Sequence, residues 1–270
     1  MRDIRIGITG HRGLLGSLLA DRLHRTGLHF DTYGGDVTDD SSFTRWIDST
    51  RPQVLFHFAA MVPVQRVLSE PERAMHVNAI ALLSIAKAIA TRASDSWVFL
   101  ASTSHVYGPG AERSLLSETS PTMPQTLYGA TKLAGEYVLM PLAKHLGIPL
   151  CVGRIFSYFH ERQSPEYLVP NLVRCMQHAK HGDAIEIRDA DSIRDFLHAE
   201  MVVDAILGVC AQRYSGTINI ASGRATSVEQ LARRLISRSG KELLIKSLPS
   251  SNPIRLVGDI SKLKSAILTG

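Results

Sequence analysis

The sequence is poor in cysteine, with only three in 270 residues. Cys151, Cys175 and Cys210 lie far apart and lack Cys-x-x-Cys spacing, so neither a disulfide framework nor a zinc site is expected. We expect each to be a small buried apolar residue. The net charge is +5 and the pI is about 9.2, yet no run of lysine and arginine stands out. This combination favours small anionic ligands over nucleic acid as partners.

The sequence also shows no signal-peptide pattern and no apolar stretch of membrane-spanning length. Its first residues, MRDIRIGITG, run directly into a strand pattern. We therefore expect a cytoplasmic protein without a membrane partner. Hydrophobic residues make up 44% of the chain, which is typical of globular proteins and suits one large α/β domain, or one domain with a smaller lobe.

Short apolar runs alternate with helical patterns over residues 1–157. Strands are predicted at 4–9, 28–33, 54–60, 97–103 and 148–156. This alternation predicts a doubly wound parallel sheet, whose ligands bind beyond the carboxyl ends of the strands. Residues 158–270 are expected to form mainly a small C-terminal lobe over that edge, with later segments returning to the first domain. Helices in this part are predicted near 168–181, 200–212 and 227–238.

Three glycines follow the first predicted strand, in the stretch ITGHRGLLG. Gly10 allows a tight turn, Gly13 lets a pyrophosphate approach the backbone, and Gly16 lets the next helix pack closely on the strand. Free N–H groups at the start of that helix attract phosphates. The stretch therefore predicts a dinucleotide site, and a glycine-rich turn without a ligand is the alternative.

Two further stretches follow predicted strands at the same edge. Asp36 can accept a hydrogen bond from an adenine amino group while Val37 lies against the ring; a solvated helix cap is the alternative. Phe58, Ala59 and Ala60 end the third strand, where small residues let a cofactor cross the sheet edge. Close packing of a helix is the alternative there.

Tyr128 and Lys132 lie four residues apart in the stretch YGATK, on a predicted helix that starts near residue 126. This spacing places both side chains on one face. Because an ammonium favours a nearby phenolate, we expect a lowered pKa for Tyr128, which suits proton exchange with a substrate oxygen. Thr103, between Ser102 and Ser104, ends the fourth strand and can share that oxygen. A Tyr–Lys pair taken alone is more often a surface contact.

Together these stretches resemble the extended short-chain dehydrogenases/reductases of the NAD-dependent epimerase/dehydratase family, which modify nucleotide sugars. The resemblance covers nearly the whole chain and rests on TGHRGLLG, GDVTD, FHFAA, ASTSHVYG, YGATK, GRIF and IRDFLHAEMVVDAI. It implies a Rossmann-type domain, a C-terminal substrate-binding lobe, a nicotinamide cofactor and a nucleotide-sugar substrate. It also implies a homodimer formed by helices around 70–92 and 127–146.

The resemblance assigns roles to individual residues. It makes Tyr128 the acid/base, Lys132 its partner and a ligand of the nicotinamide ribose, and Thr103 the third catalytic residue. The implied cofactor-binding residues are Gly10, His11, Arg12, Gly13, Leu14, Leu15, Gly16, Asp36, Val37, Phe58, Ala59, Ala60, Asn78, Ala101, Tyr128, Lys132 and Ile155. The implied substrate-binding residues are Thr103, Ser104, Tyr128, Asn171 and Arg194. No metal ligand is expected.

The resemblance also bears on three further points, at Asn78, Arg194 and Asp259. Asn78 matches the structural asparagine of the family. Arg194, in RDFLH, matches the arginine that contacts the phosphates of the sugar nucleotide; an ion pair with Asp195 or Asp191 is the alternative. Asp259 matches a common helix start and is expected to be a cap.

Arg12 lies between two glycines whose backbone is expected to face the cofactor. Its guanidinium can bind a 2′-phosphate with two hydrogen bonds, whereas a free 2′-hydroxyl is usually met by an acidic residue ending the second strand. Asp31 lies too early in its strand for that role, and GHRG is similar to the loop of NADPH-dependent GDP-fucose synthases. We predict NADP(H) as cofactor; the alternative is that Arg12 faces solvent and NAD(H) binds.

Dehydratases of this family carry an Asp-Glu pair directly after the Ser/Thr, where this sequence has Ser104 and His105. We therefore predict a reductase that moves a hydride from NADPH to C4 of a nucleotide-linked 4-keto sugar. An NAD-dependent 4-epimerase is the alternative, and a non-catalytic NADP-binding sensor or scaffold is the alternative from another class. Ser157 replaces a usual asparagine, and LPSSNPIR replaces an Arg-Pro pair, so the sugar stays open.

Overall fold

The computed structural model describes residues 4–62, 64–108 and 115–268. Six parallel strands form the main sheet, in the order β2-β1-β3-β4-β5-β9. This confirms the predicted doubly wound sheet. The connection after β1 leads to β2 on one side and the connection after β3 leads to β4 on the other, so a crevice opens at the carboxyl ends of β1 and β3. The strands are β1 (Ile6–Thr9), β2 (Phe30–Tyr33), β3 (Val54–His57), β4 (Trp97–Thr103), β5 (Leu150–Ile155) and β9 (Gly216–Ile220).

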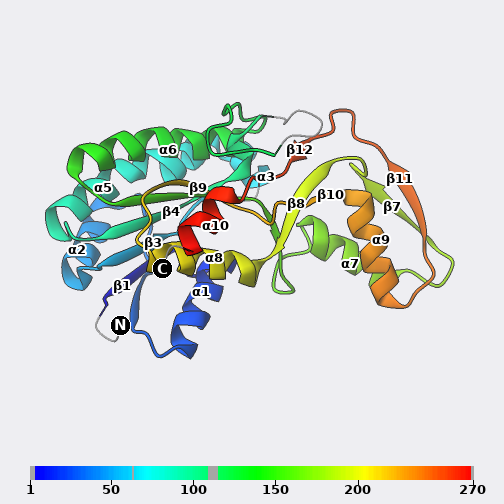
Figure 1. Cartoon of the computed structure of the whole chain (residues 1–270), viewed down its shortest axis with the longest axis horizontal. Helices are drawn as coiled ribbons and strands as arrows, with labels where there is room; N and C mark the ends of the chain where they lie inside the picture. The colour runs from blue at the N-terminus through cyan, green and yellow to red at the C-terminus, as the bar shows by residue number, and fades with distance from the viewer. Residues whose placement is uncertain (1–3, 63, 109–114, 269–270) are drawn as a thin grey trace.

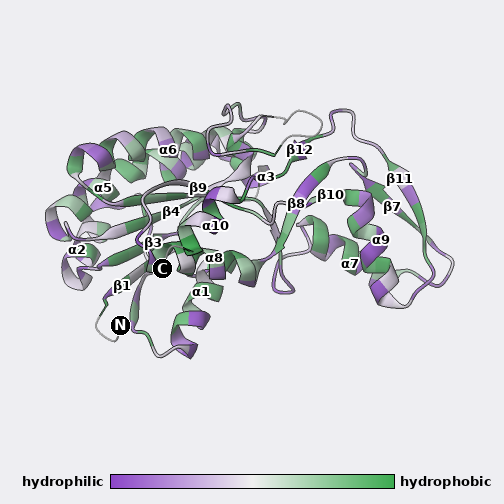
Figure 2. Cartoon of the chain, viewed as in Figure 1, coloured by the Kyte–Doolittle hydropathy of each residue, from purple (hydrophilic) through white to green (hydrophobic). Residues whose placement is uncertain are grey.

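Helices cover both faces of the main sheet (Figure 1). One face carries α2 (Asp40–Thr50), α5 (Ala81–Arg92) and α6 (Leu127–Leu146); the other carries α1 (Leu14–Arg25), α8 (Ala199–Ala211) and α10 (Ser261–Leu268). Because both faces are covered, β1, β3 and β5 are buried along their whole length. Figure 2 shows hydrophobic, green segments among the strands of the main sheet, between its two layers of helices.

One continuous helical stretch, Pro71–Arg92, is long and apolar enough to cross a membrane by length and composition alone. It joins α4 (Pro71–Met75), the π-helical turn η1 (His76–Ile80) and α5, and it follows the short α3 (Val64–Ser69). The expectation that no stretch reaches this length is therefore wrong. The stretch packs between α2 and α6 with half of its most apolar window buried, which a core helix of a globular protein also does.

A smaller lobe forms beside the carboxyl edge of the main sheet (Figure 1). It has its own apolar core, in which Leu172, Ile187 and Ala232 are buried. Residues from the second half of the chain also return to the main sheet, because β9 pairs with β5 and α8 packs on α1. The lobe elements are β6 (Ser157–Phe159), α7 (Leu168–His178), β7 (Ala184–Arg188), β8 (Ile193–His198), β10 (Ala225–Ser227), α9 (Val228–Ser239), β11 (Leu244–Leu248) and β12 (Arg255–Leu256).

The three cysteines have different environments. Cys151 is buried in β5, Cys210 is half-buried on α8, and Cys175 is exposed on α7. The expectation that all three are buried is therefore wrong for Cys175. Helix α7 buries the stripe that contains Leu172 and Met176, and Cys175 falls on the solvent side of the 3.6-residue repeat.

A buried ion pair fixes α6 to the sheet. Arg154 of β5 and Glu136 of α6 have side chains that are 7% and 0% exposed, and their Nη2 and Oε2 atoms lie 2.7 Å apart. Glu136 also accepts a hydrogen bond from Ser102 of β4. Since Glu136 lies one turn after Lys132, this pair determines how α6 meets the end of β4.

We expect Glu136→Gln to lower the free energy of unfolding by about 3–5 kcal/mol, because Arg154 keeps its charge in a buried site without a charged partner. Urea denaturation measures this loss. The matched control is Glu186→Gln, which removes a carboxylate from an exposed pair with Lys246 and should cost no more than about 1 kcal/mol. Equal losses for the two variants would contradict the anchoring role.

Candidate active site

The glycine loop forms a tight cradle between β1 and α1. Gly10 has φ +70°, and a Cβ on it would lie 2.5 Å from the backbone nitrogen of Ala59. Only glycine fits this position without moving the chain. Gly13 is the N-cap of α1 and donates its N–H to the carbonyl of Gly10 at 2.9 Å. The loop therefore brings bare backbone and the start of α1 to the sheet edge, which fits a pyrophosphate.

A cavity of about 450 Å³ opens beside this loop. Its size and its position at the strand ends suit the adenosine half of a dinucleotide. Leu14, Leu15 and Gly16 lie directly behind it in the first turn of α1. The predicted cofactor residues that line it are Gly10, His11, Arg12, Gly13, Asp36, Val37, Phe58, Ala59 and Ala60. Arg66 and Arg73 also line this cavity. No motif in the sequence marks them, so they were not predicted.

The guanidinium of Arg12 reaches from the glycine loop to the end of β2, beside this cavity. The guanidinium of Arg12 lies 3.7 Å from where a Cβ of Gly34 would be. Asp31 lies in mid-strand, paired with Gly7. No carboxylate therefore stands at the end of β2 itself, where one would meet a free 2′-hydroxyl.

Asp36 lines the cavity but is not the helix cap. Asp39 caps α2 by accepting from the backbone of Ser42 at 2.9 Å. Asp36 accepts from the backbone and hydroxyl of Thr38 at 3.0 and 2.8 Å, and these bonds lower the pKa of its carboxyl. The other carboxylate oxygen lies 3.7 Å from the guanidinium of Arg73.

Tyr128 and Thr103 meet where α6 begins at the end of β4. Thr126 caps α6 by accepting from the backbone of Gly129, which starts the helix just before Tyr128. Burial raises the pKa of Tyr128 to about 12, and a hydrogen bond with Thr103 partly opposes the rise. The expected lowering by Lys132 is wrong in this structure, because burial penalises the phenolate more strongly. The phenol therefore keeps its proton at neutral pH.

Lys132 lies deeper along the same face of α6 and is 5% exposed. Burial lowers the pKa of Lys132 to about 8, and Glu136 opposes this shift. His57, at the end of β3, is bonded through Nδ1 to the hydroxyl of Thr9 at 2.9 Å. Burial, and then Lys132, lower the pKa of His57 to about 3, so its imidazole is neutral. Sequence analysis missed His57, although a polar residue inside the apolar run VLFHF is an available signal.

Asn78 lies in the π-helical turn η1, and its side chain is fully engaged within the protein. It accepts from the backbone of Met61 at 2.8 Å and donates to the carbonyl of Met61 and to the hydroxyl of Thr131. These bonds tie the loop after β3 to α6, which fits the structural role implied for it. Ile155 lies beside Thr103 in register, and Ala101 precedes it on β4.

The other predicted substrate residues lie in the turn after β4 and in the lobe. Tyr158 of β6 and Tyr167, the N-cap of α7, lie close enough to Tyr128 that their phenolates would oppose one another, which contributes, after burial, to the raised pKa values of Tyr128 and Tyr158. Asn171 lies one turn after Tyr167, and its side chain accepts from Arg174 at 3.1 Å. Ser104 is buried beside Thr103. The side-chain oxygen of Asn171, a predicted substrate residue, is therefore already hydrogen-bonded within α7.

Arg194 does not form the ion pair that the sequence left open. Asp195 is buried and accepts from the backbone of Ser222 and Gly223 at 2.8 Å each. Asp191 accepts from the backbone of Ser250 instead. The Nε atom of Arg194 is buried without a hydrogen-bond partner among the described residues. A buried donor of this kind can bind an anion. Asp259 bonds the backbone of Ser261 at the start of α10, as a cap does.

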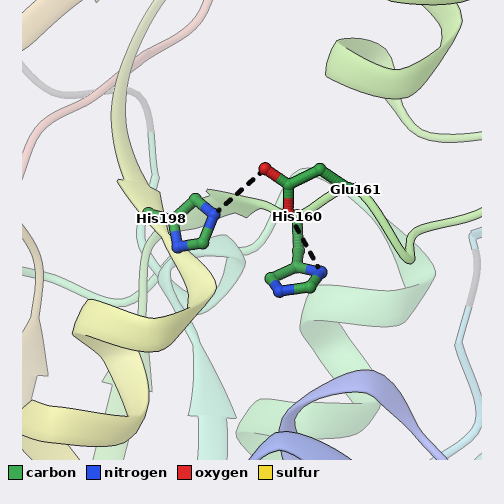
Figure 3. A group of neighbouring side chains, drawn as sticks. All are labelled: His160, Glu161 and His198. Atoms are coloured by element: carbon green, nitrogen blue, oxygen red, sulfur yellow. Dashed lines mark ion pairs between the residues drawn. The ribbon is translucent and has the colours of Figure 1, made fainter.

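A cluster of His160, Glu161 and His198 lies on the rim of the lobe, with its possible ligand atoms within 4.8 Å of one another (Figure 3). The Nδ1 atoms of His160 and His198 accept backbone N–H groups at 3.0 and 3.4 Å. In the neutral rings Nε2 then carries the proton, and that of His198 points at Glu161 from 3.6 Å. Because backbone N–H groups already occupy both Nδ1 atoms, this arrangement fits a polar surface cluster better than a metal site.

We expect Lys132→Met to raise the free energy of unfolding at pH 7 by about 1–3 kcal/mol while abolishing turnover. Below about pH 8 both folded and unfolded chains hold the Lys132 proton, so the folded state bears the full cost of the buried charge. As pH rises from about 8 toward 10.5, the unfolded chain holds more protons, so wild-type stability should rise relative to the variant. Denaturation curves across this range measure the difference; a destabilised variant at pH 7 contradicts the account.

The family profile described as GDP-mannose 4,6 dehydratase matches residues 16–252. UDP-glucose 4-epimerase of Mycoplasma genitalium is 28% identical over 90% of this chain and 77% of its own length. GDP-6-deoxy-D-mannose reductase of Pseudomonas aeruginosa is 26% identical over 74% and 67%. GDP-mannose 4,6 dehydratase 2 of Caenorhabditis elegans is 26% identical over 82%, and the chain spans 59% of its length.

Solved structures share the whole architecture. UDP-glucose 4-epimerase of Thermus thermophilus, in complex with NAD, has a TM-score of 0.85 at 20% identity and covers 97% of this chain and 92% of its own. RMD of Pseudomonas aeruginosa, complexed with NADPH, has a TM-score of 0.85 at 22% identity, covering 98% and 92%. The chain belongs to the extended short-chain dehydrogenases/reductases, in the NAD-dependent epimerase/dehydratase family of NAD(P)-dependent enzymes that modify nucleotide sugars.

Proposed function

We propose that this enzyme reduces the C4 ketone of a nucleotide-diphosphate 4-keto sugar, with NADPH as cofactor. The observation that carries the proposal is the proton-bearing phenol of Tyr128, hydrogen-bonded to Thr103 at the end of β4. Reduction of a ketone needs a proton donor at the carbonyl oxygen, and a phenol with a raised pKa keeps its proton until that oxygen becomes basic. Bound NADPH supplies the hydride.

Four side chains of the enzyme bind the substrate and transfer the proton. Thr103 and Tyr128 hold the C4 oxygen between their hydroxyls, and Tyr128 donates its proton as charge develops on that oxygen. The ammonium of Lys132 stabilises the phenolate that results. Arg194 offers its free Nε to the diphosphate, which fits its lack of an internal partner.

Two features favour reduction over dehydration, although a dehydratase profile matches the chain. Removal of water from the sugar needs an acid and a base beyond the Thr–Tyr–Lys set. The turn after Thr103 carries Ser104 and His105 instead of two carboxylates, and Ser104 is 2% exposed. The second feature is the likeness to GDP-6-deoxy-D-mannose reductase over 74% of the chain, although GDP-mannose 4,6 dehydratase 2 matches 82%.

Arg12 is the residue on which the NADPH assignment rests. It lies beside the end of β2, and it shares the cavity wall with Arg66 and Arg73. Arg66 pairs with Glu70 and Arg73 with Asp36, whereas Arg12 has no ion pair among the described residues and fits a 2′-phosphate on the adenosine ribose. The enzyme is further proposed to be a homodimer through α5 and α6, whose exposed apolar side chains, with those of the adjoining η1, include Ile80, Leu83, Tyr137 and Met140.

The second candidate is an NAD-dependent 4-epimerase, favoured by the likeness to UDP-glucose 4-epimerase over 90% of the chain. An epimerase needs Tyr128 as a base, which the raised pKa opposes. Assay of GDP- and dTDP-linked 4-keto-6-deoxy sugars with exchangeable NADPH tests the reductase. Interconversion of UDP-glucose and UDP-galactose with copurifying NAD⁺ supports the epimerase, and cofactor binding without any turnover supports a sensor.

We expect Tyr128→Phe to lower kcat by about 10²–10⁴-fold, because the proton donor is lost. The Kd for NADPH should stay within about threefold, since the ring remains. Steady-state kinetics and fluorescence titration of NADPH measure the two effects. Tyr214→Phe, which removes a hydroxyl bonded to the carbonyl of Thr217, is the control and should retain wild-type kcat. A Tyr128→Phe enzyme that keeps most of its activity removes Tyr128 from the mechanism.

We expect Arg12→Ser to weaken NADPH binding by about 10–100-fold and to leave NADH binding unchanged, because only NADPH has the 2′-phosphate. Isothermal titration with both cofactors measures this selectivity. Arg45→Ser, on the exposed side of α2, should change neither Kd. Equal weakening of both cofactors by Arg12→Ser contradicts recognition of the 2′-phosphate by Arg12.

A further inference from the structure

The chain crosses between the main sheet and the lobe after β5, β8, β9 and β12 (Figure 1). Asp195 of β8 is fully buried and bonds to two of these crossings. Its Oδ1 atom accepts from the backbone of Ser222, in the turn after β9, at 2.8 Å. Its Oδ2 atom accepts from the backbone of Gly223 at 2.8 Å and from that of Gly258, after β12, at 3.3 Å. One carboxylate therefore holds both crossings against β8.

The groups around Asp195 are arranged to donate to it. The hydroxyl of Ser222 also donates to Oδ1, because the backbone N–H of Arg224 already binds this hydroxyl as an acceptor. A Cβ on Gly258 would lie 3.0 Å from the ring of Phe156, the residue that links β5 to β6. A third crossing therefore packs against the same point. Because a buried carboxylate is costly unless it is hydrogen-bonded, β8 cannot move away from these donors without loss.

Arg194 is the residue whose place depends most directly on this arrangement. It precedes Asp195 in β8, and its side chain projects from the opposite face of the strand. Its buried Nε has no hydrogen-bond partner among the described residues, so that atom does not anchor the guanidinium. Tyr128 and Thr103 belong to α6 and β4, on the side of the main sheet. The distance from Arg194 to these two residues thus follows from how β8 is held against the main sheet.

We propose that Asp195 is a positioning residue for the substrate. By fixing β8 against the ends of β9 and β12, it sets the distance between Arg194, which binds the diphosphate, and Tyr128, which binds the reacting sugar carbon's oxygen. The inference rests on the proposed function, because that function assigns Arg194 to the diphosphate. A sugar nucleotide spans both residues, whereas the glycine cradle between β1 and α1 lies outside the clamp. A displaced β8 therefore weakens the binding of the sugar nucleotide and spares that of the cofactor.

Asp195→Asn tests this role, because either orientation of the amide points an N–H group at a backbone N–H. The substrate is GDP-4-keto-6-deoxymannose or dTDP-4-keto-6-deoxyglucose, whichever the wild-type enzyme reduces. We expect its KM to rise by about 10–100-fold, and the Kd for GDP or dTDP, measured by isothermal titration, to rise by a similar factor. The kcat at saturating substrate and the Kd for NADPH should stay within about threefold.

A double-mutant cycle with Arg194→Ala separates positioning from a general loss of structure. If Asp195 acts through Arg194, Asp195→Asn should raise KM and the nucleoside-diphosphate Kd by less than about threefold in the Arg194→Ala background. The control is Asp191→Asn, whose carboxylate accepts the backbone N–H of Ser250 within the lobe and which should retain the wild-type KM. Ser222→Ala removes one of the four donors and should raise the same constants by about 3–10-fold. It replaces Asp195→Asn in the cycle if that variant shows no cooperative thermal melt.

Losses that multiply in the double variant overturn the inference and leave the proposed function intact. An equal loss of NADPH binding has the same consequence, as do an unchanged KM and an unchanged nucleoside-diphosphate Kd in the Asp195 and Ser222 variants. Wild-type enzyme that reduces neither sugar overturns the proposed function, and the Kd values for GDP and dTDP then still decide the role of Asp195. Wild-type enzyme that binds neither nucleoside diphosphate overturns both.

Discussion

The buried pair of Glu136 and Arg154 is the interaction on which the geometry of the site depends. Glu136 joins α6 to β5 through Arg154 and to β4 through Ser102. Ser102 immediately precedes Thr103, and Glu136 lies one turn after Lys132. One carboxylate therefore holds the two elements that carry the proposed catalytic set. A buried ion pair adds little net stability compared with apolar packing, but it allows few alternative arrangements, and this fixes α6 at one depth.

Burial controls the protons of the site more than neighbouring charges do. It leaves the proton on Tyr128, and it favours neutral imidazoles at His57 and His105. Lys132 is held near the point where its ammonium loses its proton. A site in this state keeps a transferable proton on Tyr128, which is what the proposed reduction needs. The Tyr–Lys spacing correctly places both residues on one helix face, but spacing carries no information about desolvation, so the direction of the Tyr128 pKa shift was predicted wrongly.

Local patterns predicted the fold well because each reports a local constraint. Gly10 needs positive φ and a close approach to Ala59, and both requirements are visible as a glycine directly after an apolar strand. Contacts between distant segments leave no such pattern. Asn78 is bonded to Met61 and Thr131, and only the folded chain brings these residues together. The exposure of Cys175 was missed for a related reason, since it depends on which face of α7 the lobe covers.

Arg194 and Asp195 illustrate how the sheet of the lobe separates neighbours in sequence. Successive residues of β8 point to opposite faces, so an adjacent acid and base do not pair. Asp195 is satisfied by backbone N–H groups of the segment after β9, and Arg194 is left with a buried Nε that has no partner among the described residues. Leaving such a donor unpaired is costly, so folding alone gives no reason to retain it. An anion bound there would recover the lost hydrogen bond, and this is the physical ground on which the proposed function assigns Arg194 to the substrate phosphates.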